Sequence, residues 1–169
     1  MKGIALACLG SILITVFFLV PPDSGWAGIA PFVDSAGSVG EKHTASADTT
    51  EIEIVSKGVE LSYSVSEIRA KAGEVLRIRY INESDMSHNI VLVREEADIR
   101  PVGIAALQAM ATDWIPEKEM HRILAYSDLA YSGDTVVLSF NVPPPGTYPY
   151  ICTYSAHWTQ MQGRLISTE

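Results

Sequence analysis

The sequence predicts an all-β Greek-key sandwich with one short helical insertion. From Glu51 onward, apolar and polar residues alternate in short runs, which is the period of strands that bury one face. Turn-forming residues separate these runs at fairly regular intervals, as they do in β-sandwiches. Between residues 97 and 112 the alternation stops, and apolar residues recur at helical spacing instead.

The first half of the domain carries most of the predicted strands. Alternating apolar residues predict strands at 51–54, 59–65 and 74–81. On the third of these, Leu76, Ile78 and Tyr80 share one face. Residues 82–85 are polar and are expected to form a loop. The run 88–93 is apolar on both faces, as expected for a central strand in a sandwich.

The second half combines a helix with the closing strands. Pro101 suits the first turn of a helix, and Ile104, Leu107 and Ala111 recur at i, i+3 and i+7. Alternation then predicts three closing strands, at 135–142, 148–152 and 162–168. Pro149 cannot donate a backbone hydrogen bond, so we expect it at a bulge or at an unpaired edge.

The N-terminal segment is predicted to lie outside this domain. A basic Lys2, the apolar run Ile4–Val20 and small residues after it are the parts of an export signal, so residues 1–27 are interpreted as a leader. The alternative is an uncleaved anchor helix, for which this run is short. Residues 28–50 are interpreted as a flexible linker, which leaves 51–169 as the folded domain. Export implies a periplasmic or otherwise extracytoplasmic protein, tethered to the membrane if the leader is retained.

Charge and cysteine content narrow the range of partners. The chain has a formal net charge of −8 at pH 7, which argues against nucleic acid as a partner. It holds two cysteines, Cys8 in the predicted leader and Cys152 in the domain. The domain therefore has no disulfide. A lone thiol in an oxidising compartment favours a bound metal that occupies it.

A short segment near the C-terminus carries three metal-ligating side chains. Cys152, His157 and Met161 offer a thiolate, an imidazole and a thioether within ten residues. A thiolate with an imidazole suits copper or zinc, and the thioether favours copper. A fourth ligand is expected from a distant strand, and His88 is the candidate because it opens an apolar, strand-like run. The remaining histidines lie in polar stretches and are interpreted as solvent-exposed: His43 and His121.

The spacing Cys-x4-His-x3-Met, combined with a distant His-Asn pair, resembles the azurins and auracyanins, the bacterial blue copper proteins of the cupredoxin family. The resemblance runs from about Ile52 to Thr168 and includes three further matching segments in the same order, 86–89, 123–129 and 144–148. It implies a cupredoxin fold, one copper ion that cycles between Cu(I) and Cu(II), and electron transfer rather than catalysis.

The resemblance also implies a role for each residue around the copper. The two imidazoles of His88 and His157 and the thiolate of Cys152 would form a trigonal plane. Met161 would make a long axial contact. The carbonyl of Ser87 would make a weaker contact on the opposite side.

Neighbouring residues are implied to support this site. Asn89 resembles the asparagine that ties the two ligand loops together, and its backbone N–H and that of Tyr154 would donate to the thiolate of Cys152, which favours Cu(I). The ligand loop departs from the azurin pattern at Ser155 and Ala156, where azurins usually have Pro-Gly. If that glycine has a positive φ, Ala156 would be strained.

These features favour a mononuclear copper protein that carries single electrons between redox partners, such as cytochromes or membrane electron-transfer complexes. In multicopper and nitrite-reductase enzymes a histidine beside the cysteine links two copper centres, whereas Ile151 and Thr153 flank Cys152 here. The alternatives are a module for copper delivery or storage, an accessory domain of a copper oxidoreductase, and a protein-binding sandwich without metal.

Electrons are expected to enter and leave through His157, whose ring edge should reach the surface while His88 stays buried. No charged residue lies between 152 and 162, so the surface around His157 should be apolar and suited to docking. The predicted docking patch consists of Met86, Ala156 and Trp158. In the alternative, Trp158 folds inward to shield the copper.

Overall fold

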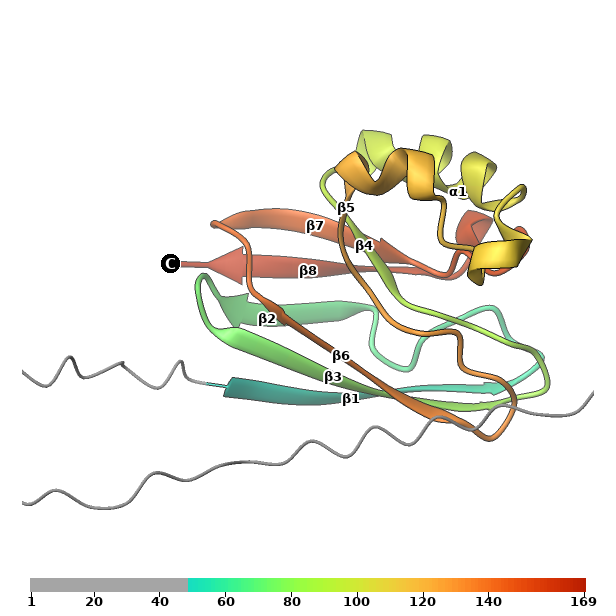
Figure 1. Ribbon diagram of the computed structural model, residues 1–169. Helices are drawn as coiled ribbons and strands as arrows, with labels where there is room; N and C mark the ends of the chain where they lie inside the picture. The colour runs from blue at the N-terminus through green and yellow to red at the C-terminus, as the bar shows by residue number, and fades with distance from the viewer. Residues whose placement is uncertain (1–48) are drawn as a thin grey trace, which may run out of the picture. The chain divides into compact units, whose positions relative to one another are not determined.

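Two β-sheets face one another across an apolar core in the computed structural model, which describes residues 49–169 (Figure 1). One sheet has the strand order β1-β3-β6 and the other β2-β8-β7-β4-β5. The first contains β1 (Thr49–Gly58), β3 (Val75–Ser84) and β6 (Thr135–Asn141). The second contains β2 (Glu67–Lys71), β8 (Gln162–Thr168), β7 (Gly146–Ile151), β4 (Val91–Val93) and β5 (Ile123–Tyr126). The predicted all-β sandwich is confirmed.

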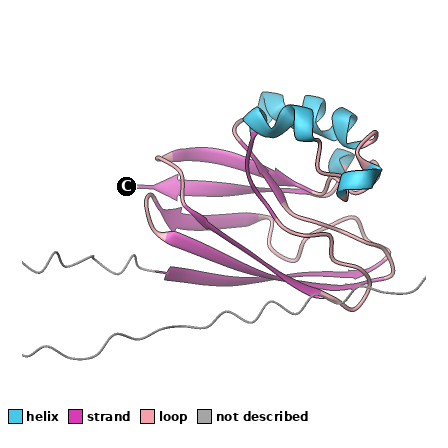
Figure 2. Ribbon diagram, in the orientation of Figure 1, coloured by secondary structure: helices cyan, strands magenta, loops and turns pink. Residues whose placement is uncertain are grey.

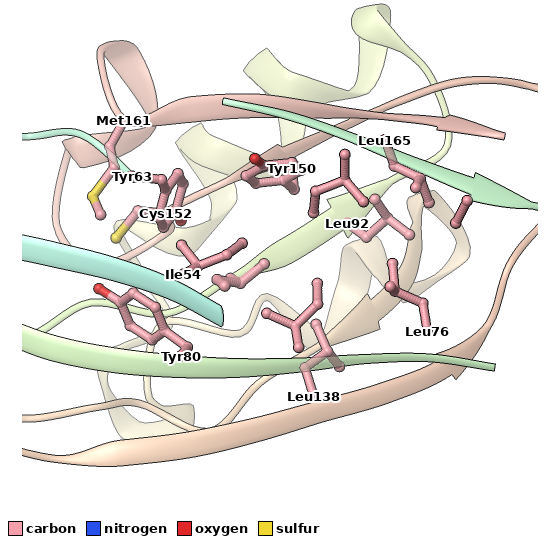
Figure 3. Packing of buried hydrophobic residues seen from close by; sticks show 14 of the residues in the cluster. Ile54, Tyr63, Leu76, Tyr80, Leu92, Leu138, Tyr150, Cys152, Met161 and Leu165 are labelled. Atoms are coloured by element: carbon pink, nitrogen blue, oxygen red, sulfur yellow. The ribbon is translucent and has the colours of Figure 1, made fainter. Parts of the chain in front are cut away.

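Alternating burial along the strands builds the core between the sheets. On β3, Leu76, Ile78 and Tyr80 are buried, as predicted, and Arg77 and Arg79 between them are exposed. The buried side chains of the two sheets form one continuous cluster (Figure 3). Because successive side chains of a strand point to opposite faces, this pattern fixes the register of β3 against its neighbours.

The segment 59–66 crosses from one sheet to the other and is not the strand predicted at 59–65. β1 ends at Gly58, whose φ of 56° is left-handed, and the next strand, β2, was not predicted. The misleading alternation reflects real burial: Tyr63 is buried and donates from its hydroxyl to the carbonyl of Asn89 at 2.6 Å, and Leu61 and Val65 pack against the core on either side of it. A loop that buries side chains on one side imitates the period of a strand.

β3 extends to Ser84, so the prediction of a polar loop at 82–85 is also wrong. Asn82 and Ser84 are fully buried, because their side chains bond backbone groups of neighbouring loops. The amide of Asn82 donates to the carbonyl oxygens of Met86 (2.7 Å) and Ala130 (2.9 Å). Buried polar groups of this kind are tolerated only when they are hydrogen-bonded.

The predicted helical insertion lies between β4 and β5 and covers the outer face of the five-stranded sheet (Figure 2). It comprises η1 (Glu96–Asp98), α1 (Ile99–Ala106), η2 (Met110–Thr112) and η3 (Glu117–Arg122). Val91 and Val93 of β4 pack against it, whereas Leu92 faces the sandwich core. The two apolar faces of this strand therefore have two different partners.

The apolar residues whose spacing predicted the helix are not the ones that α1 buries. Ile99, Val102 and Ala106 are buried, whereas Ile104 and Leu107 are 46% and 44% exposed. Both sets have helical spacing, so the periodicity alone could not decide between them. The choice is made by packing against β4, β5 and β7, which the local sequence does not reveal.

Pro149 lies on β7, inside the five-stranded sheet, and the expectation that it sits at a bulge or an unpaired edge is confirmed on the side that faces β4. On one side it is paired with β8. On the other side, β4 pairs only with Tyr150 and Ile151, and its register shifts between Leu92 and Val93. The missing N–H is tolerated because the ladder with β4 ends before it.

Several predictions about the N-terminal segment lie outside the described residues, namely the leader 1–27, residues 28–48 of the linker, and His43. Thr49 and Thr50 open β1, so this strand begins two residues before the predicted domain boundary. Within residues 49–169, no helix is long and apolar enough to cross a membrane.

Gly163 of β8 is required by the ring of Tyr150, since a Cβ at this position would lie 2.2 Å from Tyr150 Cζ. Gly163→Ala is expected to lower the free energy of unfolding by about 1–3 kcal/mol, the usual cost of overpacking, as measured by chemical denaturation. In a Tyr150→Leu background the same substitution should cost much less. An equal loss in both backgrounds would contradict this steric explanation.

Candidate metal centre

Two loops at one end of the sandwich bring the predicted ligands together. His88 precedes β4 and is held by backbone bonds to Ala130 in both directions, at 3.0 and 2.8 Å. Cys152 follows β7, and His157 opens the short helix η4 (His157–Thr159) before β8. Cys152 and His88 are 0% exposed and His157 is 8% exposed. Of the two imidazoles, His157 is thus the one nearer the surface.

Three donor atoms converge on one point. The Sγ of Cys152 lies 3.6 Å from Nδ1 of His88 and 3.7 Å from Nδ1 of His157, and the two nitrogens are 3.1 Å apart. The point equidistant from all three atoms lies about 2.0 Å from each, close to the length of metal–imidazole bonds. The donor set and its spacing therefore fit a small metal ion without rearrangement.

Burial favours the uncharged form of all three donors, as the shifts of their pKa values show. Burial raises the pKa of the Cys152 thiol to about 12, although the backbone N–H groups of Asn89 and Tyr154 donate to its sulfur and oppose this rise. Burial, together with His157, lowers the pKa of His88 to about 4, and burial also lowers the pKa of His157. Neutral imidazole is the form that binds metals, whereas the thiol must lose its proton on binding.

Met161 closes the ligand loop. Its backbone N–H donates to the carbonyl of His157 at 2.8 Å, and its carbonyl accepts from the N–H of Cys152 at 3.1 Å. Its side chain is fully buried, and Figure 3 shows the sulfur atoms of Met161 and Cys152 at the same end of the core. A thioether is thus available beside the three converging donors.

Asn89 connects the two loops through its side-chain amide. Thr153 donates from its backbone N–H to Oδ1 of Asn89 at 2.8 Å, and Nδ2 of Asn89 lies 2.9 Å from the Thr153 hydroxyl. Both residues are fully buried. Asn89 directly follows His88, and Thr153 directly follows Cys152. The hydrogen bonds between Asn89 and Thr153 therefore fix the distance between the two loops that carry these donors.

The ligand loop carries its strain one residue earlier than expected. Ser155 has a φ of 51°, whereas Ala156 has a φ of −103°. The expectation that Ala156 is the strained residue is therefore wrong. The left-handed region is unfavourable for residues with a Cβ, so the cost of this loop shape falls on Ser155.

Trp158 packs inward, which contradicts its predicted place in the docking patch. It is half-buried against α1, and a Cβ on Gly103 of that helix would lie 2.2 Å from Cδ2 of its indole. Met86 is half-buried and Ala156 is exposed. The indole packs against the cluster that includes Val102 and Ile151, so it joins the ligand loop to the helical insertion.

An aromatic array that was not predicted flanks His157. The ring centroids of Tyr154 and His157 are 5.1 Å apart, and those of Trp114 and Tyr154 are 4.4 Å apart. Trp114 and Asp113 both have left-handed backbones, with φ of 60° and 50°. The contact between Trp114 and Tyr154 joins this part of the insertion to the ligand loop.

Sequence reasoning missed the polar residues that hold the ligands. Ser84 lies 2.8 Å from Nε2 of His88, but it sits in a run that looked like a surface turn. Thr153 gave no signal beyond its position after Cys152. Gly103 looked like an ordinary helix glycine, although its buried place beneath Trp158 has a packing cause. The exposed position expected for His121 is confirmed.

Because Ser155 is left-handed, Ser155→Gly is expected to raise the free energy of unfolding by up to about 1 kcal/mol. Relief of left-handed strain, about 1–2 kcal/mol, exceeds the extra chain entropy of glycine, about 0.5–1 kcal/mol. Thermal unfolding of the metal-free protein measures the change. Ala156→Gly is the matched control and should destabilise. A stabilising Ala156→Gly would show that the strain lies elsewhere.

Comparison with known proteins places this geometry in context. Residues 50–167 match the model of copper-binding proteins of the plastocyanin/azurin family. The chain is 39% identical over 120 residues to auracyanin-A from Chloroflexus aurantiacus, covering 68% of this chain and 72% of that protein.

Solved structures agree with this similarity. The structure of auracyanin A, described as a "blue" copper protein of Chloroflexus aurantiacus, superposes with a TM-score of 0.67 at 38% identity and covers 71% of this chain and 99% of that one. Dithionite-reduced auracyanin from Roseiflexus castenholzii gives a TM-score of 0.67 at 31% identity and covers 72% and 99%.

Proposed function

Since the chain belongs to the plastocyanin/azurin family of copper-binding proteins, we propose that His88, Cys152 and His157 hold its single copper ion. The chain is a blue copper electron carrier and not an enzyme. Copper supplies the one-electron change between Cu(I) and Cu(II). The observation that carries the ligand assignment is the triangle of donor atoms, with sides of 3.1, 3.6 and 3.7 Å.

The chain's own residues keep this site in one geometry. The amide of Asn89 holds the two loops at a fixed spacing, and the backbone N–H groups of Asn89 and Tyr154 donate to the sulfur of Cys152. Such bonds stabilise negative charge on sulfur and thereby favour Cu(I). A site that is already assembled reorganises little when an electron arrives.

The axial positions complete the proposal. Met161 supplies a thioether on one side of the donor plane, and the carbonyl of Ser87 is assigned to the other side. The buried thioether beside Cys152 supports the first assignment (Figure 3). A soft, weak axial ligand suits a copper ion that changes oxidation state, because it does not strongly favour Cu(II).

Cys152→Ser is expected to abolish the intense visible absorption of the copper(II)-loaded protein. An alkoxide is a poor charge-transfer donor to copper, whereas a thiolate is a good one. Absorption spectroscopy after copper titration measures the band, and circular dichroism confirms that the variant is folded. The control is His121→Ala, which removes an exposed imidazole and should leave the band unchanged. A Cys152→Ser variant that keeps its colour would refute the assignment.

We further propose that partners dock over His157, on an apolar surface to which Ala156 and Met86 contribute and Trp158 contributes little. The absence of charge between 152 and 162 supports this surface, and small, weak contacts suit carriers that must release their partners quickly. The partners are redox proteins, in our proposal cytochromes or membrane complexes, outside the cytoplasm. A retained leader would provide a membrane tether.

Ala156→Lys and Ala156→Glu are each expected to slow electron exchange with a c-type cytochrome several-fold, because each places a desolvation cost at the centre of the docking surface. Stopped-flow absorption measures the rate, and an unchanged visible spectrum shows that the copper site is intact. The matched controls are Ser139→Lys and Ser139→Glu, at an exposed position on β6. If both Ala156 variants kept the wild-type rate, docking would occur elsewhere.

A further inference from the structure

The second nitrogen of His88 meets a buried hydroxyl. Nδ1 of His88 faces Cys152 and His157, and Nε2 lies 2.8 Å from Oγ of Ser84. Both His88 and Ser84 are 0% exposed, so water does not compete for this contact. For Nδ1 to bind a metal, the ring proton must reside on Nε2, and Ser84 is placed to accept it.

The hydroxyl of Ser84 has no freedom to turn away. The backbone N–H of Met86 donates to Oγ of Ser84 at 3.0 Å, and the Ser84 hydroxyl donates to the carbonyl of Met86 at 3.2 Å. A hydroxyl has one proton and two lone pairs. With the proton and one lone pair engaged by Met86, the remaining lone pair is the one that faces His88.

Asn82 in turn fixes the backbone on both sides of this contact. Its Oδ1 accepts the backbone N–H of Ser84 at 3.0 Å, and its Nδ2 donates to the carbonyl of Met86 at 2.7 Å and to that of Ala130 at 2.9 Å. Ala130 is the backbone partner of His88. The acceptor and the imidazole are thus attached to one buried framework.

We propose that Ser84 is a positioning residue for the metal site, which sets the tautomer and the ring orientation of His88 through the Nε2–H···Oγ bond. This inference rests on the proposed role of His88 as a copper ligand. The partner is an uncharged hydroxyl, so it orients the ring without adding negative charge near the metal. Removing the hydrogen-bond partner of a metal-binding histidine typically lowers metal affinity about 10- to 100-fold.

The test compares Ser84→Ala with Ser56→Ala in the full-length chain. Ser56 is a matched control, because its buried hydroxyl donates to Oδ1 of the same Asn82 at 3.2 Å but does not touch His88. Copper affinity, measured by competition with a chelator, is expected to fall about 10- to 100-fold in Ser84→Ala. Ser56→Ala should lower stability without that loss. Ser84→Thr, which keeps the hydroxyl, should restore most of the affinity.

A second readout follows the ring itself. In the proton NMR spectrum of the Cu(I)-loaded wild type, the Nε2–H of His88 should give a slowly exchanging resonance. In addition, the reduction potential should shift in Ser84→Ala and not in Ser56→Ala. This resonance is measurable even if Ser84→Ala fails to fold, and its absence would overturn the proposal. Equal losses of affinity in the Ser84 and Ser56 variants would also overturn it. If the wild type bound no copper, the proposed function itself would fail.

Discussion

The metal site depends on the hydrogen bonds between the Asn89 amide and Thr153. These two residues belong to loops far apart in the sequence, and each directly follows one of the three converging donors, His88 or Cys152. The bonds of 2.8 and 2.9 Å are shielded from water, so neither loop can move without leaving a buried polar group unpaired. The distance between the donors of the two loops is therefore fixed by the buried hydrogen bonds between the loops and not by either loop alone.

The helical insertion adds a second restraint from outside the sandwich. It covers the outer face of β4 with an apolar cluster of its own, and it receives the indole of Trp158 where Gly103 leaves room. The ligand loop is consequently held on two sides, by the asparagine from within and by the insertion from without. A copper ion that alternates between two oxidation states, each with its own preferred geometry, meets the same surroundings in both.

Much of this arrangement could be predicted from the sequence, and the misses have physical causes. The spacing of Cys152, His157 and Met161 was informative because ligand chemistry needs particular atoms at particular intervals. Ser84 was missed since a serine beside charged residues looks the same whether it is exposed or buried; only its tertiary hydrogen bonds distinguish the two. The spacing of Ile104 and Leu107 predicted a helix but not its buried face, because helical spacing also fits Ile99, Val102 and Ala106. Trp158 was placed at the surface for want of any local sign of the glycine beneath it.

The parallel pairing of β1 with β3 gives the domain a polarity. Gly58 is paired with Ser84 at the metal end, and Thr49 is paired with Val75 at the far end of the same ladder. Nine steps of strand separate them, a distance of about 30 Å. The start of β1 therefore lies at the opposite end of the ladder from Ser84 and the converging donors (Figure 1). A partner that contacts the metal end is therefore separated from the start of β1 by the whole length of that strand.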